Sequence, residues 1–276
     1  MAIGLALLAA VVYGSADFLG GIASRRTAPV AVVVLSQAAG VAVLAVSWPL
    51  VPGRFYSDDV GWGVVAGIAG GSAIVALYAA LAIGRMGVVS PITAVIGAAV
   101  PVVVGFAIGG RPATLALAGV ACAFIAVVLV SANVETKGIS LSEPGLGLAL
   151  FSGIGIGVLL VTLGLGHKDA GLARMAVARA VSISLLLAYA FVRRQSLRPV
   201  AGGLPTILLA GALDMAANVL YVVSSRFGML AIVAVLTSLY PAATVFLARV
   251  VLHERLSRIQ WVGVGFAAAG VAFIAA

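Results

Sequence analysis

Long apolar runs follow one another along the whole chain, separated by short polar stretches or by stretches that contain Gly and Pro. A helix that crosses a bilayer needs about 20 mostly apolar residues. Ten segments come close to that length, at 3–23, 30–50, 61–83, 88–108, 113–131, 145–166, 172–192, 204–225, 229–248 and 259–275. The pattern predicts an all-α integral membrane protein with ten transmembrane helices. Several breaks are short, so neighbouring helices must run antiparallel and pack side by side.

The two halves of the chain resemble each other at a nearly constant spacing. The sequence Gly-Leu-Ala-Leu at 4–7 recurs at 147–150, and 77–78 (Leu-Tyr) recurs at 220–221. The distance along the chain is the same in both cases, from Gly4 to Gly147, and we call it the repeat spacing. Each repeat holds five spans, and because five is odd the second repeat enters the membrane from the opposite side. We therefore expect two inverted five-helix repeats around a central cavity, an architecture that recurs in secondary transporters. The predicted parts are a first repeat at 1–132, a linker at 133–144 and a second, inverted repeat at 145–276.

Composition supports a membrane location. Apolar residues make up 63% of the chain and charged residues 9%, whereas a soluble domain carries about 25% charged residues. The net charge of +8 does not indicate nucleic-acid binding, because the basic residues stand singly or in short clusters between apolar runs. The side that carries both termini holds five of these residues and the other side ten. The positive-inside rule places the richer side in the cytoplasm. We thus expect a multi-pass protein of a bacterial-type inner membrane with both termini outside.

The sequence offers little that indicates an enzyme. It has one cysteine, Cys122, and two histidines far apart, and it shows no phosphate-binding loop and no spacing typical of a metal site. We therefore predict no catalytic activity, no metal and no cofactor. The glycines Gly63, Gly67 and Gly71 recur every four residues on the third span, which lets another helix approach closely. Packing within the molecule is favoured over a dimer contact, and a monomer over an oligomer.

Ionisable residues inside a span are costly, and they usually face a cavity or a partner. Asp214 lies near the middle of the eighth span, and Asn218 and Tyr221 follow on the same face. These three side chains could bind an ammonium group or a proton. The alternative is an ion pair between Asp214 and Arg179 that only fixes the packing. Arg179 could otherwise attract the carboxylate of a substrate.

The first span carries Tyr13 and, one helical turn later, Asp17. Asp17 is a candidate substrate ligand, with pairing to Arg25 or Arg26 as an equal alternative. Further candidates for a polar lining of the cavity are Tyr78, Ser90, Thr93, Thr237 and Tyr240. Each of these could instead serve only helix packing, because hydroxyl groups join membrane helices. Three prolines should kink the fourth and ninth helices and act as hinges or as static bends, namely Pro91, Pro101 and Pro241.

The end of the chain resembles the C-terminal signature of EamA-like transporters of the drug/metabolite transporter superfamily, within which it is similar to the YddG-type exporters. The resemblance rests on 240–244, 253–256, Gln260, Gly263 and 270–271, with a weaker copy at 89–92, Pro101 and Arg111. It implies a cavity lined by helices one, three, four, six, eight and nine, with helices five and ten outside. It also implies export of amino acids or other small metabolites.

The leading hypothesis is a secondary transporter that exports amino acids or similar small metabolites by alternating access. Its partners would be a small-molecule substrate, the lipid bilayer and protons as a candidate coupling ion. One alternative is an exporter of lipophilic cations. An alternative of another class is a membrane scaffold or lipid-handling protein that transports nothing.

Overall fold

The computed structural model describes residues 1–84, 86–109, 113–131, 144–165, 167, 169–252 and 258–275. Residues 133–143 of the predicted linker, Arg111, and residues 253–256 of the resembling signature lie outside the described residues.

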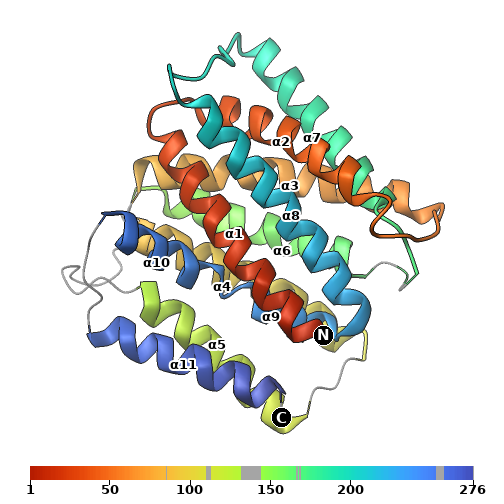
Figure 1. Ribbon diagram of the computed structural model, residues 1–276, viewed down its shortest axis with the longest axis vertical. Helices are drawn as coiled ribbons and strands as arrows, with labels where there is room; N and C mark the ends of the chain where they lie inside the picture. Colours follow the sequence, from red (N-terminus) through yellow and green to blue (C-terminus); the bar gives the residue numbers. More distant parts are fainter. Residues whose placement is uncertain are drawn as a thin grey trace.

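The described residues form eleven helices and no strand; an isolated bridge joins Arg54 to Ala170. Figure 1 shows these helices running in roughly one direction through the molecule, with the connecting loops gathered at the two ends of the bundle. Their bounds are α1 Ala2–Ser24, α2 Pro29–Ser47, α3 Asp58–Ile83, α4 Met86–Ala107, α5 Thr114–Ser131, α6 Leu146–Gly164, α7 Ala173–Val192, α8 Leu204–Phe227, α9 Leu230–Thr237, α10 Tyr240–Leu252 and α11 Arg258–Ala275.

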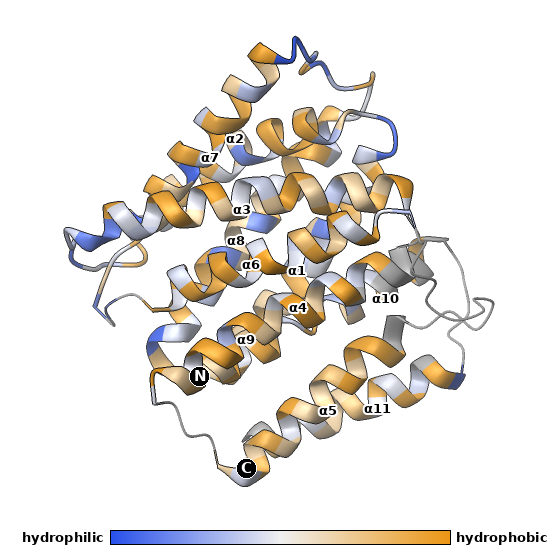
Figure 2. Cartoon of the chain, turned by 180° about the vertical axis from the view of Figure 1, so that it is seen from behind, coloured by the Kyte–Doolittle hydropathy of each residue, from blue (hydrophilic) through white to orange (hydrophobic). Residues whose placement is uncertain are grey.

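Six helices are long and apolar enough to cross a membrane: α1, α2, α3, α6, α7 and α8. Four further apolar helical stretches are shorter, at Ile92–Ala107, Thr114–Leu129, Leu230–Thr244 and Trp261–Phe273. Each of these ten stretches overlaps one of the ten predicted spans, and six of them reach spanning length. In Figure 2 the hydrophobic colouring follows the helices, and the strongly hydrophilic residues gather mainly in the loops. The all-helical membrane fold predicted from the sequence is confirmed.

The ninth predicted span is broken into α9 and α10 at Ser238 and Leu239. Pro241 explains the break, because a proline cannot donate a helical hydrogen bond to the carbonyl four residues before it, here that of Thr237. Leu239 donates instead to the Leu236 carbonyl at 3.3 Å, over a tighter turn. The prolines Pro91 and Pro101 lie within the continuous helix α4. Of the three predicted hinges, Pro241 is therefore the one beside a break in the helix.

Helices of the first half pack mainly on helices of the second half. The principal contacts are α1 with α8, α3 with α6 and α7, α2 with α8, α4 with α6, and α1 with α9 and α10. Helices α5 and α11 also pack closely on each other, and Figure 1 shows this pair along one side of the bundle. The core of the molecule therefore lies between the two halves.

The glycine strip on α3 serves packing within the molecule. A Cβ atom on Gly63 would lie 2.8 Å from the carbonyl oxygen of Arg174 on α7. Gly67 and Gly71 meet α7 equally closely, at Ala178 and Ser182. Since a larger side chain would push the helices apart, the strip fixes the distance between α3 and α7.

Candidate functional site

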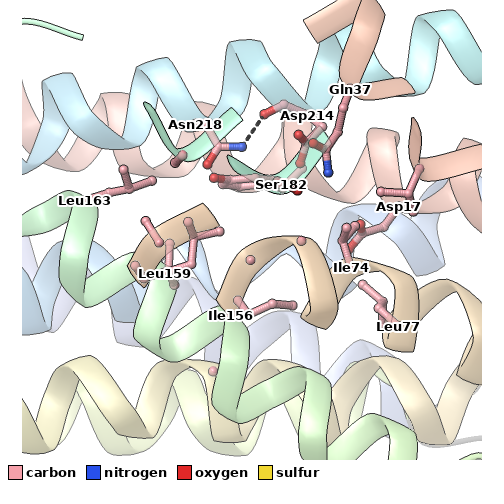
Figure 3. Close-up of a pocket in the computed structure, with 18 of the residues that line it drawn as sticks. Asp17, Gln37, Ile74, Leu77, Ile156, Leu159, Leu163, Ser182, Asp214 and Asn218 are labelled. Carbon is pink, nitrogen blue, oxygen red and sulfur yellow. Dashed lines mark hydrogen bonds between the residues drawn. The ribbon is translucent and has the colours of Figure 1, made fainter. Parts of the chain in front are cut away.

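A cavity lies in the centre of the bundle, with an empty volume of about 990 Å³ that includes space open to solvent. Residues of α1, α3, α4, α6, α8, α9 and α10 line it, as expected from the family resemblance, and neither α5 nor α11 contributes. Two further helices, α2 and α7, also line the cavity, which corrects the helix set that the resemblance implies. Figure 3 shows side chains from several of these helices converging on this space.

Two of the charged residues that line the cavity form an ion pair. Arg179 of α7 donates a hydrogen bond through its guanidinium to a carboxylate oxygen of Asp214 on α8. Both side chains are mostly buried, with exposed fractions of 14% and 21%. Asn218 donates through its side-chain amide to the backbone carbonyl of Asp214 at 2.8 Å, a bond drawn in Figure 3. The pair is thus held on two helices and borders the cavity.

A second carboxylate faces the same space. Asp17 on α1 is 8% exposed and lines the cavity, where Figure 3 shows its side chain. Among the described residues it forms no ion pair, whereas Arg25 and Arg26, the alternative partners considered from the sequence, are exposed. Asp17 and Asp214 line the same cavity. The cavity therefore holds two carboxylates and one guanidinium among its described residues.

Uncharged polar groups surround these charges. Five residues that line the cavity each carry a buried polar atom with no hydrogen-bond partner among the described residues: Tyr13 OH, Gln37 Oε1, Ser182 Oγ, Thr237 Oγ1 and Tyr240 OH. Buried polar groups are nearly always paired, and leaving one unpaired costs about 1–3 kcal/mol. These atoms are accordingly the donors and acceptors that the cavity offers to a polar ligand.

The two sides of the cavity differ in chemistry. We call the residues Tyr13, Asp17, Arg179, Asp214 and Asn218 the polar wall. Opposite them, α6 and α3 present apolar side chains, which we call the apolar wall: Ile74, Ile156, Leu159, Leu160 and Leu163. In Figure 3 Asp214 and Asn218 lie across the cavity from Ile156 and Leu159. Such a cavity suits a ligand with a charged end and an apolar body.

The predicted site residues fall into two groups. Those that line the cavity are Tyr13, Asp17, Tyr78, Asp214, Asn218, Thr237 and Tyr240. The others, Ser90, Thr93 and Tyr221, are buried away from it. Thr93 donates to the Ala149 carbonyl at 3.2 Å, and Tyr221 donates to the Leu160 carbonyl at 2.9 Å. Both therefore make contacts between helices.

Sequence reasoning missed Gln37 on α2 and Ser182 on α7, both of which line the cavity. Each is an uncharged polar residue within a mostly apolar span, and that signal was available. We gave these residues little weight, because burying a serine or a glutamine in a span costs far less free energy than burying a charge. An uncharged polar residue therefore indicates a cavity less strongly.

A second polar cluster lies at one end of the bundle. We call this end the N-terminal face: it carries the start of α1, the loop at 48–57 and the loop at 165–172, and Ser224 of α8 donates to the Ala2 carbonyl there. Arg174 is 5% exposed and donates to Asp59, 1% exposed, at 3.1 Å. It also reaches Asp58 at 3.4 Å and the Thr162 carbonyl at 2.6 Å.

The two loops of the N-terminal face are joined directly. Tyr56 stacks on His167 with ring centroids 3.9 Å apart, and its hydroxyl donates to Asp169 at 2.7 Å. This hydrogen bond raises the pKa of Tyr56 and lowers the pKa of Asp169. Backbone bonds add to the contact, since Arg54 donates to the Asp169 carbonyl and Gly171 donates to that of Arg54.

The opposite face of the bundle has a much lighter contact at the corresponding place. There the loop after α1 meets the loop after α7, and Val200 donates through its backbone to the Thr27 hydroxyl at 3.2 Å. Thr27 corresponds to Ala170 of the N-terminal face, because the repeat spacing separates the two residues. Between the described parts of these two loops, no ion pair accompanies the bond.

No group of three or more His, Cys, Asp or Glu side chains that could hold a metal ion occurs within the described residues. The absence of a metal or cofactor remains a prediction from the sequence.

Known proteins resemble this chain at two levels. Residues 143–276 match the EamA-like transporter family. A solved crystal structure is similar over 99% of this chain and 98% of its own, with a TM-score of 0.77 and 16% sequence identity. At that identity the likeness shows the fold alone. No curated protein matches the chain.

Proposed function

We propose that this chain, whose residues 143–276 match the EamA-like transporter family, is a secondary transporter that exports amino acids or similar small metabolites by alternating access. The family indicates a membrane transporter of the drug/metabolite type, and it points away from an enzyme. The observation that carries the proposal is the Arg179–Asp214 pair, which borders a central cavity beside a second carboxylate, Asp17.

The charges of the cavity match those of a zwitterion. An ammonium group would bind Asp214 or Asp17, and a carboxylate would bind Arg179 by displacing Asp214. Such an exchange replaces one ion pair by others, so no charge is left buried without a partner, which would be costly inside a membrane protein. The unpaired hydroxyl groups of Tyr13 and Tyr240 would complete the polar contacts of the substrate.

Alternating access is supported by the way the halves pack. When the two halves are exchanged, α1 takes the place of α6, α3 that of α8, and α4 that of α9 and α10. The contact of α1 with α8 then corresponds to the contact of α6 with α3, and the contact of α4 with α6 corresponds to that of α9 and α10 with α1. Glycines mark the same exchange: Gly14 packs on Tyr240 and Ala243, and Gly157, its counterpart at the repeat spacing, packs on Gly97 and Val100. We propose that residues 1–132 and 145–276 are inverted repeats, which gives the transporter two near-equivalent gates.

The break between α9 and α10 lies at the cavity and supplies a hinge. Ser238 and Tyr240, which flank Leu239, both line the cavity. We assign this hinge to Pro241 and keep both termini on the outer side of an inner membrane, as the distribution of Lys and Arg indicates. A monomer coupled to protons remains the working hypothesis.

Export of lipophilic cations is the second candidate. Asp17 lies with Tyr13, Tyr78 and Tyr240 around the same cavity, opposite the apolar wall. A carboxylate among aromatic rings suits an ammonium group without a carboxylate, since the ring faces attract cations. In that case Arg179 would serve packing alone. A scaffold that transports nothing is the third hypothesis, and it leaves the polar cavity without a role.

The proposal is tested by efflux from proteoliposomes. The purified protein is offered a panel of labelled amino acids and one lipophilic cation, with and without a pH gradient. Efflux of an amino acid that exceeds efflux from protein-free liposomes supports the proposal. Efflux of the cation alone favours the second candidate, and no efflux of either compound class contradicts both.

A further inference from the structure

A second pocket opens beside the central cavity on the side of the N-terminal face. Its empty volume is about 400 Å³, including space open to solvent. It is lined by Asp59, Leu163, His167, Ala170, Gly171, Leu172, Arg174, Met175, Val222, Ser225 and Arg226. Five of the titratable or polar side chains of the N-terminal face thus border it, whereas apolar residues form its inner end.

Two residues belong to both spaces. Leu163 of α6 and Met175 of α7 line the central cavity and also the second pocket. Their side chains are 5% and 3% exposed. They stand between the two spaces as an apolar plug, with the cavity on one side and the pocket on the other.

The polar cluster holds the elements around this plug together. Arg174 and Met175 are neighbours on α7, and Arg174 is fixed to Asp59 at the start of α3 and to the Thr162 carbonyl on α6. The three helices that frame the passage are therefore tied through one guanidinium. Arg226 of α8 adds hydrogen bonds to the carbonyls of Ala170 and Pro52.

We infer that the second pocket is the closed outer part of the transport path, with Leu163 and Met175 as its plug and the Arg174–Asp59 ion pair as its latch. The inference rests on the proposed transport function. Opening toward the N-terminal face would break this pair and let Leu163 of α6 move away from Met175 of α7.

The test uses chemical access to the cavity, so it needs no identified substrate. Leu159 lines the cavity one helical turn behind Leu163, on the side away from the pocket. A Leu159→Cys variant is made in a Cys122→Ala background, because Cys122 is the one cysteine of the chain. The new thiol is labelled with a membrane-impermeant maleimide in sealed vesicles of both orientations, and the rate from each face is measured.

Leu163→Ala removes the plug, and Arg174→Gln removes the latch. We expect each to raise the labelling rate from the N-terminal face by about tenfold and to leave the rate from the opposite face unchanged or lower. Asp58→Asn, at a side chain that is 45% exposed, should give a smaller rise and serves as the latch variant if Arg174→Gln does not fold. Arg193→Gln, on an exposed arginine of the opposite face, is the matched control and should change neither rate.

Equal labelling rates in the parent, the Leu163→Ala variant and the Asp58→Asn variant, all shown to be folded by a cooperative thermal transition, would overturn the inference. So would a rise of the same size from both faces. If labelling responds as expected but no amino acid is transported, the latch stands and the proposed substrate class fails. If amino acids are transported but the labelling rates are the same in the parent and the variants, the proposed latch is wrong and the proposed function stands.

Discussion

Parts of the polar and apolar walls of the cavity occupy corresponding positions in the two halves of the chain, yet they carry different chemistry. At the repeat spacing, Asp17 and Tyr13 correspond to Leu160 and Ile156, and Asp214 corresponds to Gly71. All six line the cavity. The close packing at Gly14 recurs at Gly157, whereas the charges of one half do not recur in the other. In the proposed mechanism the repeated packing serves two gates, and the unequal lining gives the substrate one preferred orientation.

The largest effect is expected on the polar wall. Asp214→Asn leaves the guanidinium of Arg179 buried without its counter-ion, and breaking a buried pair costs about 3–5 kcal/mol. We expect the initial rate of efflux from proteoliposomes to fall by at least about a hundredfold. Asp169→Asn, which removes an exposed carboxylate outside the cavity, is the control and should retain most of the rate. Equal rates in the wild type and Asp214→Asn would reduce Asp214 to a packing role.

The next largest effect is expected on stability, at the close helix contacts of Gly14 and its counterpart Gly157. Gly14→Val and Gly157→Val each place side-chain atoms where a Cβ alone would lie 2.7 Å from Ala243 and 2.5 Å from Val100. Because overpacking costs about 1–3 kcal/mol, both should lower the Tm in detergent by similar amounts. Gly4→Val, at a glycine with open space around it, should leave the Tm unchanged. A loss confined to one of the two variants would contradict the correspondence between the halves.

A smaller effect is expected on the apolar wall. Leu160→Asn makes this wall more like its polar counterpart, and it presents an amide to the apolar body of the substrate. We expect KM for amino acids with large apolar side chains to rise about tenfold, because a mismatch of this kind costs about 1–3 kcal/mol. Leu160→Met is the matched control. A KM that rises equally for small and large side chains would show that the apolar wall does not select the substrate.

The smallest effect belongs to the loops of the N-terminal face. The hydrogen bond from Tyr56 lowers the pKa of Asp169, so its stabilisation is present above the ordinary carboxylate pKa of about 3.9 and is lost as the pH falls through the lowered value. Tyr56→Phe should therefore lower the Tm by about 1 °C at pH 6, and the difference should shrink at pH 3. A difference that is independent of pH would mean that the ring, and not the hydroxyl, holds the loop.

The features predicted correctly from the sequence are those for which the alternative would cost much free energy. Apolar length predicted the helices, since a backbone in lipid must satisfy its own hydrogen bonds. The expense of a charge in a span drew attention to Asp17, Arg179 and Asp214, and the structure places all three at the cavity. The short breaks predicted that helices adjacent in sequence pack side by side, whereas the main contacts join helices of different halves.

Other features depend on which helix faces meet, and a single helix does not contain that information. Periodicity placed Tyr221 on the face of Asp214, but Tyr221 turns to the Leu160 carbonyl instead. Thr93 likewise meets α6, where it donates to the Ala149 carbonyl. Gln37 and Ser182 became cavity residues because α2 and α7 approach the centre more closely than the resemblance implied.

The central claim is that the Arg179–Asp214 pair recognises the two charges of a zwitterion. It is tested most directly by equilibrium binding of a labelled amino acid, its amide and its deaminated acid to the purified protein. We expect that the intact zwitterion binds best, that Arg179→Gln removes its advantage over the amide, and that Asp214→Asn removes its advantage over the deaminated acid. Equal binding of all three compounds, or binding that neither substitution changes, would contradict it.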